Sequence, residues 1–283
     1  MYTYSQCYPC FMRQAVSTIR KTGGDEQTAM EVVRKVAAEL PRFNPDEQSP
    51  PEFGETIQAI IREVTGKEDP FSSLKQKSTE EAQGLYPELK KMIQQADDPL
   101  MKAIRLAIAG NIIDFGTMVD FDLGQTIQRV LYQDIAINDI EAFRRELDKA
   151  ESILYLGDNA GETVFDKLLI EELDKPVTYA VKSGPVLNDA TLKDAWAANL
   201  NTVADIIESG STAPGTVPNS CRPEFIELLD NADMVISKGQ GNYETLDSYP
   251  RPIFFLLQTK CAVISRALDV PEKSIILKYT GDR

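Results

Sequence analysis

The second half of the chain alternates short apolar runs with amphipathic stretches, and this rhythm constrains the fold more than any other feature. From Ser152 onward, the apolar runs have the length of strands, and most of them are separated by helix-like segments. We expect strands within residues 152–157, 177–183, 202–209, 233–239, 252–258 and 274–280, and helices within residues 162–173, 189–200, 222–232 and 261–268. Such alternation predicts an α/β fold with a largely parallel sheet and helices on both faces. The runs lack polar alternation, which fits a sheet that is buried on both sides.

The first half of the chain has the spacing of helices instead. Between residues 11 and 149, apolar residues recur at intervals of three and four. We expect helices within residues 15–23, 28–40, 51–66, 78–96, 98–115 and 137–150, with loops at 41–51 and 66–73. The sequence therefore predicts a mainly helical region, residues 1–149, that forms one wall of a pocket, and an α/β domain, residues 150–283.

Composition excludes several classes of function. The chain of 283 residues has a formal net charge of −14, which argues against a nucleic-acid partner and against anionic membrane surfaces. It contains no histidine, so a Ser-His-Asp triad, a histidine base and a His-ligated zinc site are excluded. No apolar run approaches the ~18 residues that span a membrane, and the start of the chain lacks the features of a signal peptide. We expect a soluble, cytoplasmic protein.

Polar residues follow the first predicted strands at the edge of the sheet where ligands bind. In open α/β sheets, ligands bind beyond the carboxyl ends of the strands. Asp158 and Asn159 follow the first predicted strand, and Asp189 follows the second one. Asp158 and Asp189 are separated by the length of one strand–helix unit, so we expect them at adjacent strand ends. Their oxygen atoms suit Mg²⁺ or Mn²⁺, which makes the three residues candidate metal ligands.

A lysine and two glycines follow a later predicted strand. Lys238 is placed to neutralise a phosphoryl group as a point charge. Gly239 and Gly241 would let backbone N–H groups approach an anion, and a helix that opens near Asn242 would add its dipole. The stretch is not a Walker sequence, which requires G-x-x-x-x-G-K-[ST]. We predict a phosphate site next to the cation site.

Each of these residues also has a purely structural interpretation. Asp189 precedes Ala190 and Thr191 and would serve as the N-cap of the next helix. Asp158 and Asn159 would form only a turn, because Asp, Asn and Gly dominate turns. The functional interpretation is favoured because all the candidates fall on one edge with one compatible chemistry.

Several segments resemble the damage-control phosphatase family, long known only as a domain of unknown function. The segments are "LGDNAGETVFDKLLIEEL", "GPVLNDATLKDA", "ISKGQGNYETL", "RLAIAGNIIDFG" and "FFLLQTKC". The resemblance extends over nearly the whole chain. It implies a helical N-terminal region on a Rossmann-like α/β domain, and metal-dependent hydrolysis of phosphate monoesters, often of reactive or damaged phosphometabolites.

The resemblance also implies roles for single residues. The positions of the metal ligands match Asp158, Asn159 and Asp189, and the phosphate-binding lysine matches Lys238. The family's G-N-x-x-D block falls on Asn111 and Asp114, which implies that both residues line the substrate pocket from the helical region.

From the residues alone, Asn111 and Asp114 allow two interpretations, and the family block favours a pocket wall. The two lie three apart, on one face of a helix, within an unusually apolar segment. A polar pair in such a place is costly unless it is partnered or hydrated. The alternative is a helix end at which Gly110 and Gly116 stop the helix.

Cys7 and Cys10 form a C-x-x-C pair close to the start of the chain. The pair resembles that of one branch of the same family, mainly archaeal and bacterial, and Cys221 matches a third cysteine of that branch. From the residues alone, the pair is half of a tetrahedral zinc site, and Cys221 would be a third thiolate. A metal site, a redox site and plain packing all remain open, because free cysteines are often simply buried.

Taken together, the sequence predicts a divalent-metal phosphatase that acts on a small phosphorylated metabolite. Asp158, Asn159 and Asp189 would hold Mg²⁺, Mn²⁺, Co²⁺ or Ni²⁺, and Asp158 or Glu162 would position the attacking water. A phosphoaspartyl intermediate is an alternative route. Lys238 would stabilise charge on the phosphoryl oxygens. Two other classes stay open: an S-adenosylmethionine-dependent methyltransferase, and a non-catalytic metal or redox module built on the cysteines.

Overall fold

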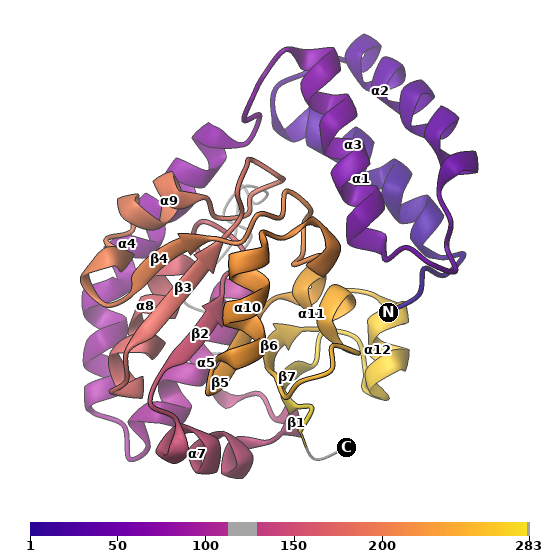
Figure 1. Ribbon diagram of the computed structural model, residues 1–283. Helices are drawn as coiled ribbons and strands as arrows, with labels where there is room; N and C mark the ends of the chain where they lie inside the picture. Colours follow the sequence, from indigo (N-terminus) through magenta and orange to yellow (C-terminus); the bar gives the residue numbers. More distant parts are fainter. Residues whose placement is uncertain (113–128, 282–283) are drawn as a thin grey trace.

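The structure is a computed structural model that describes residues 1–112 and 129–281, and its centre is one seven-stranded sheet (Figure 1). The strand order is β1-β7-β6-β5-β2-β3-β4. The strands are β1 (Ile135–Asn138), β2 (Ile153–Leu156), β3 (Val177–Val181), β4 (Asp205–Glu208), β5 (Met234–Lys238), β6 (Phe254–Gln258) and β7 (Ile275–Tyr279). Strands β2 to β7 each lie within a predicted run, so the predicted α/β class is confirmed.

Two features of the sheet differ from the prediction. Strand β7 runs antiparallel to β6, while the other neighbouring strands are parallel, so the sheet is largely parallel and not wholly so. Strand β1 is not predicted at all, because the sequence assigns residues 137–150 to one helix. In the structure that helix is shorter, α7 (Ile140–Lys149), and the residues before it pair with β7.

Helices cover both faces of the sheet, and each face has its own core. One face carries α4 (Ser72–Gln94), α5 (Pro99–Ile112), α7, α8 (Thr163–Leu173) and α9 (Leu192–Ala197). The other face carries α10 (Pro223–Asn231), α11 (Gln240–Leu246) and α12 (Ala262–Leu268). Alternate residues of one strand enter different cores: Tyr155 of β2 belongs to the first, and Leu154 to the second. This division is the expected result of the two-residue period of a strand.

The amino-terminal helices form a third core beside the sheet. They are α1 (Cys7–Lys21), α2 (Glu26–Glu39) and α3 (Pro50–Thr65), and Phe11, Phe43 and Phe53 lie at their centre. α3 starts with a capping box, in which Ser49 and Glu52 bind each other's backbone N–H, and it ends at Gly66 in the left-handed region.

Polar contacts join α3 to the loops that follow the strands. Arg62 Nη1 donates to the carbonyl oxygen of Pro185 at 2.9 Å, and the hydroxyl of Thr212 donates to Glu55. The bundle of α1, α2 and α3 therefore lies against the carboxyl-end edge of the sheet. The predicted boundary at residue 149 stays a prediction, and the sheet itself crosses it through β1.

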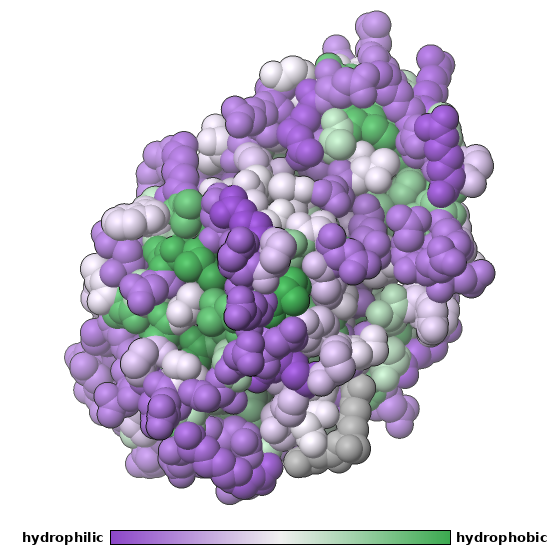
Figure 2. Space-filling view, in the orientation of Figure 1, coloured by the Kyte–Doolittle hydropathy of each residue, from purple (hydrophilic) through white to green (hydrophobic). Residues whose placement is uncertain are grey.

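Short 3₁₀ helices at η1 (Leu40–Arg42), η2 (Leu200–Thr202) and η3 (Pro218–Ser220) complete the elements. Figure 2 shows hydrophilic residues over most of one face, with apolar atoms gathered in front of the sheet beside α10. Within residues 1–112 and 129–281, no helix combines the length and the apolar character that crossing a bilayer requires.

Candidate active site

The candidate site lies where β2, β3 and β5 end side by side. β2 pairs in parallel with β3 on one side and with β5 on the other, so the three carboxyl ends meet at one edge. The strand order reverses between β2 and β5, and such a switch point is the usual place for a ligand in an α/β sheet. The prediction that Asp158 and Asp189 lie at adjacent strand ends is confirmed.

Asp158 is a buried carboxylate that is 8% exposed. Its Oδ2 accepts hydrogen bonds from Asn111 Nδ2 at 2.7 Å and from Asn159 Nδ2 at 3.2 Å. Burial, together with the charge of Glu162, raises the pKa of Asp158 to about 6, although the charge of Lys260 opposes the shift. A carboxylate in this setting is stabilised in its ionised form by an added cation.

Asp189 lies beside Asp158 on the loop after β3. Asn159 and Asp189 form an isolated backbone bridge, and the N–H of Ala190 donates to the carbonyl oxygen of Asp158 at 2.8 Å. The Oδ2 atom of Asp189 is buried and has no hydrogen-bond partner among the described residues, with Lys182 Nζ 3.8 Å away. Burial and the charge of Asp158 hold the pKa of Asp189 well above its ordinary value.

The helix-cap interpretation of Asp189 is wrong. α9 starts after Thr191, whose hydroxyl and N–H donate to Asp194 Oδ2 at 2.7 and 2.9 Å. This capping box satisfies the helix start without Asp189. The carboxylate of Asp189 is therefore available as a ligand.

Asn111 reaches the site from the helical half of the chain, on the last turn of α5. Its Nδ2 donates to Asp158 Oδ2 and to Glu162 Oε1, both at 2.7 Å. Its Oδ1 is buried and has no hydrogen-bond partner among the described residues. Asn111 thus offers a free oxygen atom at the site, as expected of a pocket wall. Asp114 lies outside the described residues.

Glu162 connects the polar side chains of the site. Its Oε1 accepts from Asn111 and Asn159, and its Oε2 accepts from Lys238 Nζ at 3.1 Å. The side chain is 1% exposed. Because both oxygen atoms are already bonded, the expected role of Glu162 in positioning water is not supported, and we assign it to orienting the two amides.

Lys238 differs from its predicted role. Its ammonium group is fully buried and lies 3.1 Å from Glu162 and 2.5 Å from Asp166. Burial lowers the pKa of Lys238, but Asp166 and Glu162 outweigh that effect and the net shift is upward. The hydroxyls of Tyr155 and Tyr179 also donate to Asp166, at 2.8 and 2.7 Å. In this arrangement Lys238 balances carboxylates beneath the site instead of facing a phosphate.

The glycine stretch after β5 has a different use from the one predicted. The N–H of Gly239 donates to the carbonyl oxygen of Leu256, so it is not free for an anion. A Cβ atom at Gly239 would lie 1.9 Å from Asp158 Oδ2, and one at Gly241 would lie 2.0 Å from the carbonyl oxygen of Pro214. The two glycines therefore keep space open for the carboxylate and for a neighbouring loop.

Asn242, predicted to bind substrate, is fully buried and structural. Its Nδ2 donates to the carbonyl oxygens of Gly157 and Lys238, at 3.1 and 2.8 Å. Its Oδ1 accepts from Thr216 and from Lys182 Nζ, at 2.9 and 3.3 Å. Asn242 holds the ends of β2 and β5 together.

Sequence reasoning overlooked two lysines, Lys182 and Lys260. Lys182 directly follows β3 and lies between Asp189 and Asn242. Lys260 follows β6, is exposed, and its charge is the first among those that lower the pKa of Asp158. Both lysines could have been found from the sequence, because ligands bind beyond the carboxyl ends of the strands and each lysine lies within two residues of such an end.

The residues of the site fit a divalent cation. The carboxylates of Asp158, Glu162, Asp166 and Asp189 are buried at this edge, against the buried ammonium groups of Lys182 and Lys238. These four carboxylates outnumber the two buried ammonium groups, and a divalent cation would reduce the excess of negative charge. Within the described residues, no three or more Asp, Glu, Cys or His side chains are placed to hold a metal by themselves. Among these residues, the amide oxygen of Asn111 could complete a ligand set.

The cysteines do not form the set that the sequence suggested. Cys7 and Cys10 lie in the first turn of α1, and the charge of Cys261, not that of Cys221, acts on both. Burial raises the pKa of Cys221 to about 11, and burial also raises the pKa of Cys7 and of Cys10. All four thiols are free. Thiols with a raised pKa, such as Cys7 and Cys221, are typical of packing.

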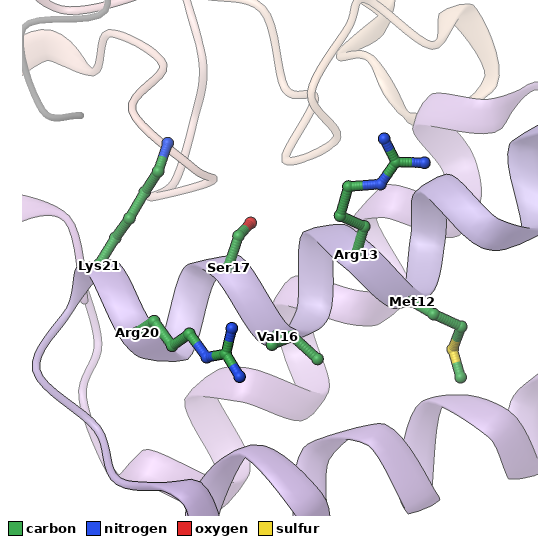
Figure 3. Close-up of a pocket in the computed structure, with 6 residues that line it drawn as sticks. All are labelled: Met12, Arg13, Val16, Ser17, Arg20 and Lys21. Carbon is green, nitrogen blue, oxygen red and sulfur yellow. The ribbon is translucent and has the colours of Figure 1, made fainter. Parts of the chain in front are cut away.

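A pocket of about 460 Å³ lies elsewhere, on the surface of α1 (Figure 3). Arg13, Ser17 and Lys21 point to one side of the helix, and Met12 points to the other. None of the predicted site residues lines it. The pocket is therefore distinct from the candidate site.

Comparisons with known proteins show the family and the fold of the chain. Residues 3–276 match the family model of the damage-control phosphatase ARMT1-like domain. The crystal structure of a DUF89 family protein from Pyrococcus horikoshii is similar to this structure, with a TM-score of 0.90, 31% identity and 98% of each chain covered.

Curated relatives are similar over most of their length. A damage-control phosphatase of Pyrococcus horikoshii is 33% identical, over 96% of both chains. A damage-control phosphatase of Archaeoglobus fulgidus is 32% identical, over 78% of this chain and 80% of the relative. An uncharacterized protein of Methanocaldococcus jannaschii is 31% identical, over 94% of this chain and 91% of the relative.

Proposed function

Because the chain belongs to the damage-control phosphatase ARMT1-like family, we propose that it hydrolyses small phosphate monoesters with the help of a divalent cation. The observation that carries this proposal is that two buried oxygen atoms, Asn111 Oδ1 and Asp189 Oδ2, accept no hydrogen bond from the described residues, at an edge rich in buried carboxylates. Unsatisfied buried oxygens are costly, and a cation would satisfy them.

Asp158, Asn159 and Asp189 would hold the cation, with Asn111 Oδ1 as a further oxygen ligand. Oxygen donors of this kind suit Mg²⁺ and Mn²⁺, and Co²⁺ and Ni²⁺ are also candidates. When bound, a divalent cation polarises a phosphoryl oxygen and makes a bound water acidic. Glu162 fixes the amides of Asn111 and Asn159, so that their oxygen atoms point away from it.

The phosphoryl group would lie against positive charge on the other side of the site. Lys182 follows β3 and Lys260 follows β6 at the same edge of the sheet, and we propose the exposed Lys260 as a partner of the phosphate, with the buried Lys182 behind it next to Asp189. These groups would bind and orient the phosphate and stabilise charge on its oxygens.

The test is metal-dependent release of phosphate from small sugar phosphates. We expect release only with an added divalent cation, and at least a ~100-fold loss in Asp158→Ala and in Asp189→Ala, because each removes a ligand. Asp205→Ala, on the exposed edge strand β4, is the matched control and should keep full activity. Full activity in both site variants would show that the assignment of the cation site is wrong.

The two alternatives have less support. The methyltransferase interpretation requires an acidic residue at the end of the second predicted strand, which is β3. Lys182 follows β3 instead. A metal module on the cysteines expects three converging thiols, and within the described residues no such group is placed to hold a metal. A small phosphorylated metabolite as partner, a cytoplasmic location and the absence of a nucleic-acid partner stay predictions from the sequence.

A further inference from the structure

Lys75, on α4 in the helical half, is completely buried and touches the loop of Asp189. Its side chain is 0% exposed. Its Nζ lies 2.9 Å from Asp69 Oδ2, 2.9 Å from Asp194 Oδ2 and 3.3 Å from the backbone carbonyl oxygen of Asp189. An ammonium group has three hydrogens, so these three oxygen atoms use its full bonding capacity.

The loop of Asp189 is held between two supports, and Lys75 is one of them. On the side of β2, the N–H of Ala190 donates to the carbonyl oxygen of Asp158, and the N–H of Ala160 donates to the carbonyl oxygen of Asn188, both at 2.8 Å. On the other side the structure shows Lys75, which binds the carbonyl oxygen of Asp189 itself. The backbone of Asp189 is thus fixed from both sides. Its Oδ2 lies at the site and accepts no hydrogen bond from the described residues.

From this geometry we infer that Lys75 is a positioning residue for the cation ligand Asp189. It contacts neither the cation nor the substrate. It fixes the backbone of Asp189, so that the affinity for the cation depends on a residue of the helical region. The inference rests on the proposed function, because it takes Asp189 as a ligand.

The experiment measures cation affinity separately from turnover in Lys75→Met. Binding of Mn²⁺ is followed by calorimetry, and the Mn²⁺ concentration for half-maximal activity is compared with kcat at saturating Mn²⁺. We expect a ~10–100-fold weaker affinity for Mn²⁺, as is typical when a residue behind a ligand is removed. At saturating Mn²⁺, kcat should recover to within threefold, since no residue of the chemistry has changed.

Two further variants separate this role from stability. Lys90→Met removes another lysine of α4 that pairs with the α/β half, at the partly exposed Glu171, and should keep the wild-type affinity for Mn²⁺. The double variant Lys75→Met with Asp69→Asn removes one charge of each sign, so it avoids leaving a second carboxylate unpaired and keeps the fold testable if Lys75→Met alone unfolds. The double variant should show the same weak affinity.

Two results would be distinguishable. If the wild type binds Mn²⁺ and the folded variants without Lys75 bind it equally well, the positioning role is wrong and the proposed function stands. If the wild type neither binds nor needs any divalent cation, the proposed function fails, and the role of Lys75 fails with it.

Discussion

Replacing Gly239 with alanine perturbs the candidate site through a single methyl group. The new Cβ would lie 1.9 Å from Oδ2 and 2.3 Å from Cγ of Asp158, whereas real Cβ contacts shorter than 3.0 Å essentially never occur. The carboxylate must therefore move by roughly 1 Å, and a shift of that size at a reacting group costs about 10²-fold in rate. The backbone at Gly239 has a φ of 81° and a ψ of 163°, a region that is nearly restricted to glycine, which adds about 1–3 kcal/mol of strain for any other residue.

The assay compares phosphate release at saturating Mn²⁺ with the free energy of unfolding in urea. We expect Gly239→Ala to lose about 100-fold in kcat/KM and about 2–4 kcal/mol of stability, from strain and from weakened hydrogen bonds to Asp158. Gly66→Ala is the matched control, because Gly66 has a φ of 65° and no other atom lies within 4 Å of the place that a new Cβ would take. It should lose about 1–2 kcal/mol of stability and no activity.

Retained activity in Gly239→Ala would refute this role of the glycine. If the variant keeps an activity within threefold of that of Gly66→Ala, then the space that Gly239 leaves beside Asp158 has no role in the reaction. A loss of activity that merely follows the loss of stability, equal in both variants, would refute it as well.

Three other outcomes follow from buried charges. Burial raises the pKa of Glu244 to about 7 in the folded protein, so the free energy of unfolding should fall as the pH rises from about 4.5 to 7. Glu244→Gln lacks this titration and should be up to about 3 kcal/mol more stable than the wild type at pH 8, with the gain vanishing at pH 4, as measured by urea unfolding. Lys238→Met leaves Glu162 and Asp166 without their cation and should cost about 3–5 kcal/mol in the same assay. Mn²⁺ at about 100 times its Kd should stabilise the protein by about 2.7 kcal/mol, seen as a rise in Tm that a chelator reverses; an unchanged Tm would count against the cation site.

The sheet was predictable from the sequence because its central strands are buried on both faces. Every residue of β2 and β5 is buried, so each strand stands out as an unbroken apolar run. β1 has only four residues with alternating exposure, and its apolar residues fit the helical spacing of α7. The antiparallel direction of β7 was beyond prediction, because the periodicity of a strand carries no information about its direction.

The candidate site was predictable only in part, because strand ends indicate where residues lie and not what they bind. The rule placed Asp158 and Asp189 side by side. It assigned Lys238 to a phosphate, since the sequence does not show that Asp166, inside α8, faces the same ammonium group. Glu162 and Asp166 are four residues apart and so lie on one face of the helix, and this spacing was the sequence signal that both carboxylates could pair with one cation. Lys75 had none, since two of its three partners, Asp189 and Asp194, lie in the distant half of the chain.

The buried ammonium group of Lys75 has a consequence for synthesis on the ribosome. Its carbonyl partner, Asp189, lies 114 residues further along the chain. At about 5–20 residues per second, the lysine emerges roughly 6–20 s before that partner exists. During that interval Asp69 is the one of its three oxygen partners that already exists. The environment of this charge is thus completed only by residues that lie 114 and 119 positions further along the chain.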